Sequence, residues 1–339
     1  MFRAILRATV YLTALVLLTA CSGDDPEAAY RTYLERLGRT LDVDVTAVRP
    51  PEFPRPPRPG ALRLPITSDS LDTLDFLSLS GCAVQVTIGK RNSSLGRMAA
   101  PSQRLLLALE YLRLAPECVE TLRADGKDSL ADTLENAQRL KRDQLPALIF
   151  NATLGSDEYR AFWQARSTPG GFPPVDPATA ENALSAINGY TRRWLAGDYT
   201  ADNQAFEILL AEVAGGGGGR LLNRLLVQAA WLDAANAMLG TRLARGPLCA
   251  PGTRHAAADI LPKVVEKFFV GEIQPAAAIL HRQTYQVLPP AQELEALLSN
   301  VLPEPFRAWQ AERDNRLEHS RSAPRRHVEQ VQAIQSPCN

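Results

Sequence analysis

The densest group of side chains able to do chemistry lies between Gly89 and Arg104. Gly89 and Gly96 free the backbone to turn, and cationic and hydrogen-bonding residues crowd the positions around them. A helix is expected to follow, and its amino terminus together with these side chains can hold an anion such as a phosphate, a carboxylate or a lipid headgroup. The candidate binding residues are Lys90, Arg91, Asn92, Ser93, Ser94, Arg97 and Arg104.

Two alternatives stand beside this anion site. In the first, the loop is structural, and Arg91 and Asn92 bond carbonyl groups at the carboxyl end of a helix. In the second, the region is catalytic, with Ser93 as a nucleophile and Lys90 as its base. The usual serine-lysine pair places the serine first, whereas here the order is reversed.

A hydrolase of the cell wall, built on a helical domain, would need one buried glutamate as its acid. Glu110 and Glu117 lie close to the loop in sequence, and Glu110 also lies beside the apolar stripe of its predicted helix. Long glutamate side chains at such positions are commonly solvated neighbours of the stripe. Glu110 is the catalytic residue that this alternative would use.

The sequence indicates neither a metal site nor a nucleotide site. None of the histidines has a second ligand at the spacing typical of a metal site; they are His255, His281, His319 and His327. Five glycines, Gly215 to Gly219, precede Arg220, but the Gly-Lys-Ser/Thr ending of a phosphate-binding loop is missing. We therefore expect no cofactor, and a flexible connection between helices at the glycines.

The amino terminus has the order of parts of a secretory signal, in which Arg3 and Arg7 precede an apolar run of about a dozen residues. That run is shorter than the roughly 20 residues that span a bilayer. Leu18-Thr19-Ala20-Cys21 follows, and the Cys21 thiol can take a diacylglycerol thioether. The sequence therefore predicts removal of residues 1–20 and an anchor of three acyl chains, palmitate among them, at Cys21. Ser22, where retention in the inner membrane usually needs Asp, favours the outer membrane.

Charge and cysteine usage agree with an exported protein. Without residues 1–20 the chain has 35 basic and 37 acidic residues, so it lacks the basic excess of a nucleic-acid binder. Four cysteines remain besides Cys21, and they allow three disulfide connectivities. We expect Cys82 with Cys118 and Cys249 with Cys338, because each pair closes within its own half of the chain.

Leucine and alanine recur at helical spacing, which predicts an all-α fold, a multi-helix bundle-like domain. Helices are expected from Asp25, from Ser68 through Leu77, after Pro101, over Leu130–Leu140, from Asp176, and over Leu221–Leu239, Ala256–Leu288 with a break near Gly271, Ala291–Leu298 and Phe306–Glu318. Ala83 to Ile88 alternates like a strand, but we assign it to a helix because no partner strand offers itself.

Seven prolines between Arg49 and Pro65 predict an extended segment near the amino terminus. This proline-rich segment is either a spacer wrapped against its own domain or a cationic strip that follows headgroups or peptidoglycan. The expected organisation is a signal peptide at 1–20, then the anchor, a short helix and the proline-rich segment at 21–67, and a helical domain at 68–339. A sub-boundary near 167–175 or 215–219 is the alternative.

One family combines these features: the lipid-attachment motif, the tyrosine-rich first helix, the stretch from Leu71 to Cys82, and Arg-Asn-Ser-Ser-Leu-Gly-Arg at Arg91 to Arg97. The sequence resembles the envelope lipoproteins of Gram-negative bacteria grouped as domain of unknown function 3080, over most of the chain after Cys21. The resemblance implies a helical domain and brings no activity, catalytic residue or cofactor.

Two functions follow as expectations. The first is a non-catalytic binding or structural protein, lipid-anchored at the outer membrane and facing the periplasm. Its partners would be the membrane itself and an envelope protein, a lipid headgroup or peptidoglycan, met through Lys90 to Arg104. The alternative is a cell-wall hydrolase or lytic enzyme.

Overall fold

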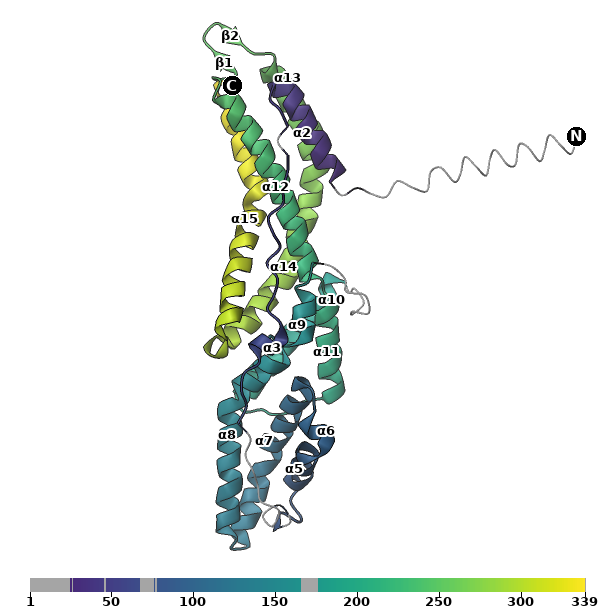
Figure 1. The fold of residues 1–339 in the computed structure, drawn as a ribbon, viewed down its shortest axis with the longest axis vertical. Coiled ribbons are helices and arrows are strands. Elements are labelled where there is room, and N and C mark those ends of the chain that lie inside the picture. Colours follow the sequence, from purple (N-terminus) through teal and green to yellow (C-terminus); the bar gives the residue numbers. More distant parts are fainter. Residues whose placement is uncertain are drawn as a thin grey trace, which may run out of the picture. The chain divides into compact units, whose positions relative to one another are not determined.

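A computed structural model describes residues 25, 27–45, 47–67, 76, 78–165 and 176–338. Within these residues the regular structure is helical apart from one short antiparallel hairpin, β1 (Cys249–Ala250) and β2 (Thr253–Arg254), which confirms the all-α prediction (Figure 1). No helix in these ranges combines the length and the apolar character that a membrane span requires. The chain forms two compact units, each built from separate stretches of sequence.

Unit 1 comprises the described residues of the ranges 1–49, 230–277 and 323–339. Its elements are α2 (Ala28–Leu41), the second part of α12 (Gly218–Leu243), the hairpin, α13 (Ala257–Val264), the π-helix η1 (Val265–Ile273), the last part of α15 (Glu304–Gln335) and the 3-10 turn η3 (Ser336–Cys338). The apolar stripe expected in the first helix is buried, and α2 packs with it against α13 and η1. The Cys249–Cys338 disulfide joins the hairpin to η3.

Unit 1 contains a fully buried histidine. His327, on α15, is fully buried, and its Nδ1 lies 2.7 Å from the amide oxygen of Asn236 on α12. Because an amide oxygen only accepts, Nδ1 carries the proton and Nε2 accepts from the Tyr33 hydroxyl of α2, also at 2.7 Å. The Phe269 ring of η1 covers the imidazole edge-on. Burial lowers the pKa of His327 to about 4, so the folded state holds it uncharged.

Unit 2 comprises residues 50–229 and 278–322. In chain order it contains α3 (Pro59–Leu62), α5 (Val84–Asn92), α6 (Ser94–Arg97), α7 (Pro101–Ala124), α8 (Asp128–Ala152), α9 (Asp157–Phe162), α10 (Pro177–Leu195), α11 (Asn203–Gly215), the first part of α12, most of α14 (Gln274–Leu297), the 3-10 turn η2 (Ser299–Val301) and the first part of α15. Helices α7 and α8 form a long antiparallel hairpin, against which α5 packs (Figure 1). The Cys82–Cys118 disulfide links the residues just before α5 to α7.

The five glycines from Gly215 to Gly219 are buried, so the expectation of a flexible connection is wrong. A Cβ atom on Gly216 would come within 2.4 Å of the Ala180 Cβ, and one on Gly218 within 2.6 Å of the Phe162 ring. At Gly219 it would come within 2.3 Å of the Trp163 carbonyl oxygen. The glycines are therefore there for close packing between the ends of α11 and α12 and the aromatic side chains of the core.

The proline-rich segment is wrapped against unit 2, which answers the question that the sequence left open. Leu62 is buried in the core, and the Trp309 indole N–H donates to the Pro54 carbonyl oxygen at 3.2 Å. The Asn151 side chain donates to the Leu64 carbonyl and accepts from the Leu64 amide, both at 2.9 Å. An asparagine on α8 thus bonds the backbone at Leu64, just after the short helix α3 that interrupts the extended segment.

The structure changes several expected helix bounds. Residues Ala83–Ile88 do form a helix, within α5. The break near Gly271 is absent, because α13, η1 and α14 follow one another directly and Gly271 lies inside the π-helix. The separate helix expected at Ala291–Leu298 is instead the end of α14, which continues through Pro289 and Pro290. Helix α15 also runs well past Glu318, through Pro324 to Gln335. The helix expected over Ser68–Leu77 lies outside the described residues, apart from Phe76.

Acid is expected to destabilise the protein through His327. The unfolded imidazole gains its proton below pH 6.5, whereas the folded one stays neutral down to about pH 4, so this residue removes about 3 kcal/mol of stability between pH 7 and pH 4. Urea unfolding followed by circular dichroism at both pH values measures the loss. His327→Gln should show a smaller loss than the parent, and His255→Gln, at an exposed histidine of the same unit, an unchanged one. Equal losses in His327→Gln and the parent would contradict the assignment.

Candidate functional site

The predicted binding region forms a turn between α5 and α7. Ser93 caps α6: its hydroxyl accepts from the Gly96 amide at 3.0 Å and donates to the Lys90 carbonyl at 2.7 Å. A Cβ atom on Gly96 would lie 2.1 Å from that same carbonyl oxygen, so the turn requires glycine there. The hydroxyl is therefore used in capping, and the Lys90 ammonium lies 3.3 Å from Glu110. Neither side chain is engaged in the pairing that a Ser93 nucleophile would need.

Two arginines hold the turn at its two ends, Arg97 at the end of α5 and Arg104 at the start of α7. Arg97 donates to the Asn92 carbonyl oxygen at 2.9 Å, and Arg104 donates to the carbonyl oxygens of Ala99 and Arg97 at 2.9 and 2.8 Å. The structural alternative named Arg91 and Asn92 for bonds of this kind, and the structure shows them for Arg97 and Arg104. Because neutral carbonyls accept these bonds, the two positive charges are not neutralised by them.

The helix before the turn, α5, is anchored to the core of unit 2. Val84, Thr87 and Ile88 turn one face of α5 into the core, and the Cys82–Cys118 disulfide ties the start of α5 to α7. No aspartate or glutamate occurs in the sequence from Phe76 to Leu109. A rigid surface with a local excess of positive charge results, which we call the α5–α7 surface and define by Lys90, Arg91, Arg97 and Arg104.

Two pockets flank the first half of α7. The Lys90 pocket, of about 460 Å³, has a polar rim of cations and amides over leucine side chains, and its lining is Lys90, Gln103, Leu106, Leu107, Glu110, Arg113, Tyr199, Ala201 and Asn203. Gln103 is fixed there, since its amide nitrogen donates to Asn203 at 2.8 Å and to Glu207 at 2.7 Å. Glu110 lies at the rim, half-exposed and paired with Lys90, rather than in a buried acid site.

The second pocket, which we call the Arg104 pocket, has a volume of about 410 Å³ and lies between the proline-rich segment and α7. Its lining is Gly60, Arg63, Leu64, Pro65, Ile66, Ala99, Pro101, Arg104, Leu148 and Asn151. Two arginines and no carboxylate contribute to it, and its remaining walls are largely aliphatic. Such a pocket suits an anion that also carries apolar groups.

The other candidates contribute nothing further to this site. Cys21, with its neighbours, lies outside the described residues, so the structure does not reach the lipid-attachment motif. His327 belongs to the core of unit 1, and His281 packs against the Tyr285 ring. In the described part of the chain, no three histidine, cysteine, aspartate or glutamate side chains gather as a metal site would need. Glu117, the second acid considered, is an exposed residue of α7.

Sequence analysis missed a buried polar cluster in unit 2. Arg313 on α15 is fully buried and forms a two-pronged ion pair with Glu295 on α14, whose side chain is 1% exposed. Glu295 also accepts from the Tyr159 hydroxyl at 2.6 Å and the Gln310 amide at 2.7 Å. The guanidinium lies over the rings of Trp163 and Trp309. Residues so far apart in sequence carry no motif that could have revealed their meeting.

Burial sets the electrostatics of this cluster. Burial alone lowers the pKa of Arg313, but its hydrogen bonds to Glu295 and the charge of that carboxylate outweigh burial and raise the pKa. Burial and then the Glu295 charge raise the pKa of Tyr159, so its hydroxyl stays a donor. Arg313 also donates to the Asp314 carboxylate, which lies at the edge of the cluster. With both of its groups bonded to neighbouring side chains, the Arg313–Glu295 pair is structural.

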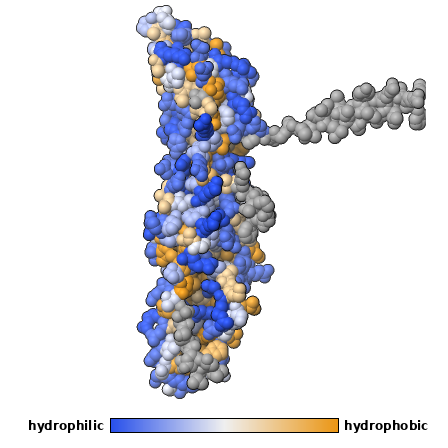
Figure 2. All heavy atoms as spheres, in the orientation of Figure 1, coloured by the Kyte–Doolittle hydropathy of each residue, from blue (hydrophilic) through white to orange (hydrophobic). Residues whose placement is uncertain are grey.

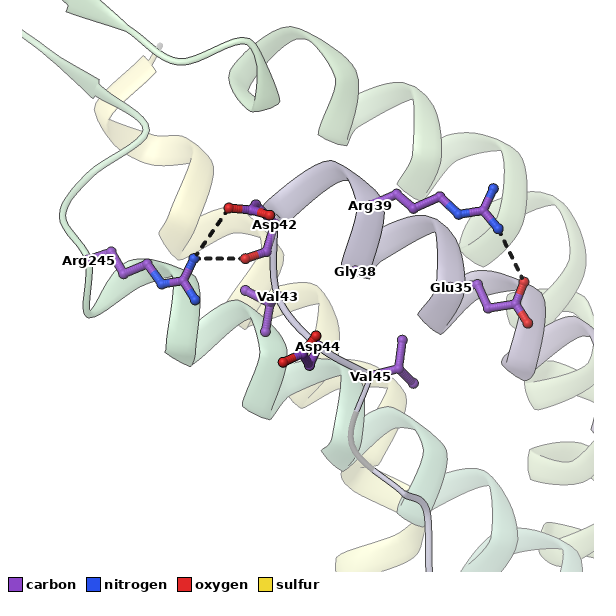
Figure 3. A pocket seen from close by; sticks show the side chains of 8 residues that line it. All are labelled: Glu35, Gly38, Arg39, Asp42, Val43, Asp44, Val45 and Arg245. Atoms are coloured by element: carbon purple, nitrogen blue, oxygen red, sulfur yellow. Dashed lines mark hydrogen bonds and ion pairs between the residues drawn. The ribbon is translucent and has the colours of Figure 1, made fainter.

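A third hollow, of about 500 Å³, lies in unit 1 at the carboxyl end of α2 (Figure 3). Asp42 ends the helix in the left-handed conformation, with φ of 55°, and Arg245 donates to its carbonyl oxygen at 2.7 Å. Glu35 pairs with Arg39 along the helix, and a Cβ atom on Gly38 would lie 2.8 Å from the Val43 carbonyl oxygen. These contacts make the hollow a helix cap in which the acidic side chains of Glu35 and Asp42 are matched by arginines.

Residues 30–339 match a family described as protein of unknown function, DUF3080. The chain belongs to this family. Neither a curated protein nor a solved structure shows significant similarity to it. The family match agrees with the resemblance seen at Arg91 to Arg97 and carries no activity with it.

Breaking the buried ion pair is expected to destabilise unit 2 strongly. Glu295→Leu removes the buried carboxylate and leaves the charged Arg313 with only the partly exposed Asp314 as a partner, which should lower the free energy of unfolding by about 3–5 kcal/mol. The double variant Glu295→Leu/Arg313→Met removes both charges and should recover most of that loss. Glu304→Gln, which breaks an exposed pair with Arg307, is the control and should change stability by less than about 1 kcal/mol. Urea unfolding measures all three, and a double variant no more stable than Glu295→Leu would argue against this account.

Proposed function

We propose that the protein is a lipid-anchored envelope protein, attached through Cys21 to the outer membrane and facing the periplasm, and that it binds an anionic partner without catalysis. The observation that carries the binding role is the α5–α7 surface, where four cations lie within an acid-free stretch of 34 residues on a rigidly capped turn. Positive charge concentrated in this way attracts anionic groups.

The contacts of the α5–α7 surface favour binding over chemistry. Ser93 is used as a helix cap, Lys90 is paired with Glu110, and Arg97 and Arg104 bond carbonyl oxygens. Each side chain is thereby held in one position, which lowers the entropy lost when a partner binds. The Lys90 and Arg104 pockets on either side of α7 offer depth for a partner group.

The export and anchoring part of the proposal rests on the sequence from Arg3 to Cys21. Support comes from the two disulfides, Cys82–Cys118 and Cys249–Cys338, which are typical of an oxidising compartment such as the periplasm. Three acyl chains exceed the two signals that stable membrane attachment requires.

Acylation at Cys21 is testable by metabolic labelling in a Gram-negative host. The protein should incorporate a radiolabelled palmitate, lose its first 20 residues and fractionate with membranes, whereas Cys21→Ala should take up no label and keep its signal uncleaved. Ser22→Ala keeps the acylated cysteine and is the control for processing. A Cys21→Ala protein that is processed and sedimented with membranes like the parent would refute the anchor.

Photo-crosslinking in intact cells tests the binding role. A photoreactive residue at Asn92, on the α5–α7 surface, should give one discrete product. The same residue at Asn136, an asparagine of α8 that is also exposed, is the matched control and should not give that product. The same mixture of neighbours from both positions would show that the surface has no defined partner.

A further inference from the structure

We propose that the α6 turn docks on the surface of an anionic phospholipid bilayer, inserting Leu95 and Met98 among the headgroups while the neighbouring arginines bind phosphate. The inference deepens the proposed function by naming the partner, and it rests on that function only for the anchor that brings the chain to a membrane. Its experiment is independent of acylation.

The first observation is a pair of large apolar side chains held in solvent. Leu95 is 85% exposed and Met98 is 86% exposed, the highest values among the large exposed hydrophobic residues described. The two lie three residues apart, Leu95 within α6 and Met98 as the residue that ends it. In Figure 2, orange hydrophobic atoms reach the surface at the level of α6, among blue hydrophilic ones.

The backbone that carries Leu95 and Met98 is held in one conformation, so the two side chains stay exposed. Gly96, between the two residues, fits against the Lys90 carbonyl with no room for a side chain. Ser93 caps the turn from one end, and Arg104 holds the carbonyl groups of Arg97 and Ala99 at the other. Leu95 and Met98 are therefore displayed on a fixed support, which favours a surface that receives them.

The second observation is charge around the apolar pair. Arg97 lies between Leu95 and Met98 in sequence, and Arg104 bonds the turn directly, so both cations flank the apolar side chains. Their bonds go to carbonyl oxygens, and their charges remain available to a phosphate. An apolar tip with two arginines on the same turn resembles segments that lie in a headgroup layer, where charge attraction adds to apolar burial.

The third observation is the Arg104 pocket, whose lining includes Ala99, the residue after Met98. Arg63 joins Arg104 at this pocket, whose aliphatic walls include Leu64, Ile66 and Leu148. A phosphodiester with the start of its acyl chains matches two guanidinium groups beside aliphatic walls. The projecting pair itself points to a penetrable layer rather than to a preformed complementary groove.

The test uses residues 21–339 with Cys21→Ser, which carries no acyl chain, in sedimentation with vesicles. One set of vesicles contains phosphatidylcholine alone and the other equal parts of phosphatidylcholine and phosphatidylglycerol. We expect binding to the anionic set alone, with an affinity that falls as salt is raised. Equal binding to both sets, or to neither, would overturn the proposal.

Two variants assign the binding to the turn. Leu95→Ser/Met98→Ser should bind the anionic vesicles about tenfold more weakly or worse, since the apolar insertion is lost. Arg63→Gln should weaken binding about fivefold. The control is Ile208→Ser/Ile279→Ser, which removes two half-exposed isoleucines of the same unit and should bind like the parent. Unchanged binding by the Leu95/Met98 variant, with an unchanged melting curve, would refute insertion.

The outcomes separate this inference from the proposed function. If Asn92 crosslinks to a protein while the vesicles stay unbound, the binding role stands and docking on a bilayer is wrong. If vesicles bind but Cys21 takes up no palmitate, docking stands and the anchor is wrong.

Discussion

The architecture of unit 2 depends on burying one arginine. Arg313 reaches the core because Glu295 neutralises it, Tyr159 and Gln310 satisfy that carboxylate, and two tryptophan rings cover the guanidinium. These partners come from α9, α14 and α15, and Trp309 also binds the proline-rich segment through Pro54. The glycines at the α11–α12 junction then fit against Phe162 and Trp163, whose positions the cluster sets. If one of the two charges were removed, the other would stay buried without this partner, and the cost of its desolvation would weaken all of these contacts.

Unit 1 buries a polar cluster that carries no charge. Tyr33, His327 and Asn236 come from three helices and form a chain of hydrogen bonds around a neutral imidazole, which Phe269 of the π-helix covers. A π-helix is wider than an α-helix, and here it supplies a ring at this junction. The Cys249–Cys338 bridge fixes the chain end that carries His327. Unit 1 is therefore expected to be stable at neutral pH and to lose stability in acid. The buried cluster of unit 2 depends instead on a charged carboxylate.

The proposed docking surface also depends on polar side chains that are held by hydrogen bonds. Arg97 and Arg104 stiffen the α6 turn by bonding carbonyl oxygens, and this leaves their positive charges to act outward. A turn fixed in this way presents Leu95 and Met98 with a smaller loss of backbone entropy on binding. The disulfide at Cys82 and the buried face of α5 carry the turn on the α7–α8 hairpin, so structure and recognition share the same residues.

The sequence by itself determined the helical class, the stripe of α2 and the candidate basic turn, because helical periodicity, proline punctuation and local charge are written in neighbouring residues. It also favoured the two disulfides that the structure contains. Tertiary structure alone decided which residues meet across long separations: Arg313 with Glu295, His327 with Tyr33, and the glycines with Phe162. It alone showed that units are assembled from separate stretches of chain, and that Leu95 and Met98 face solvent. The reason is that burial and pairing depend on contacts between distant segments, which no local pattern encodes.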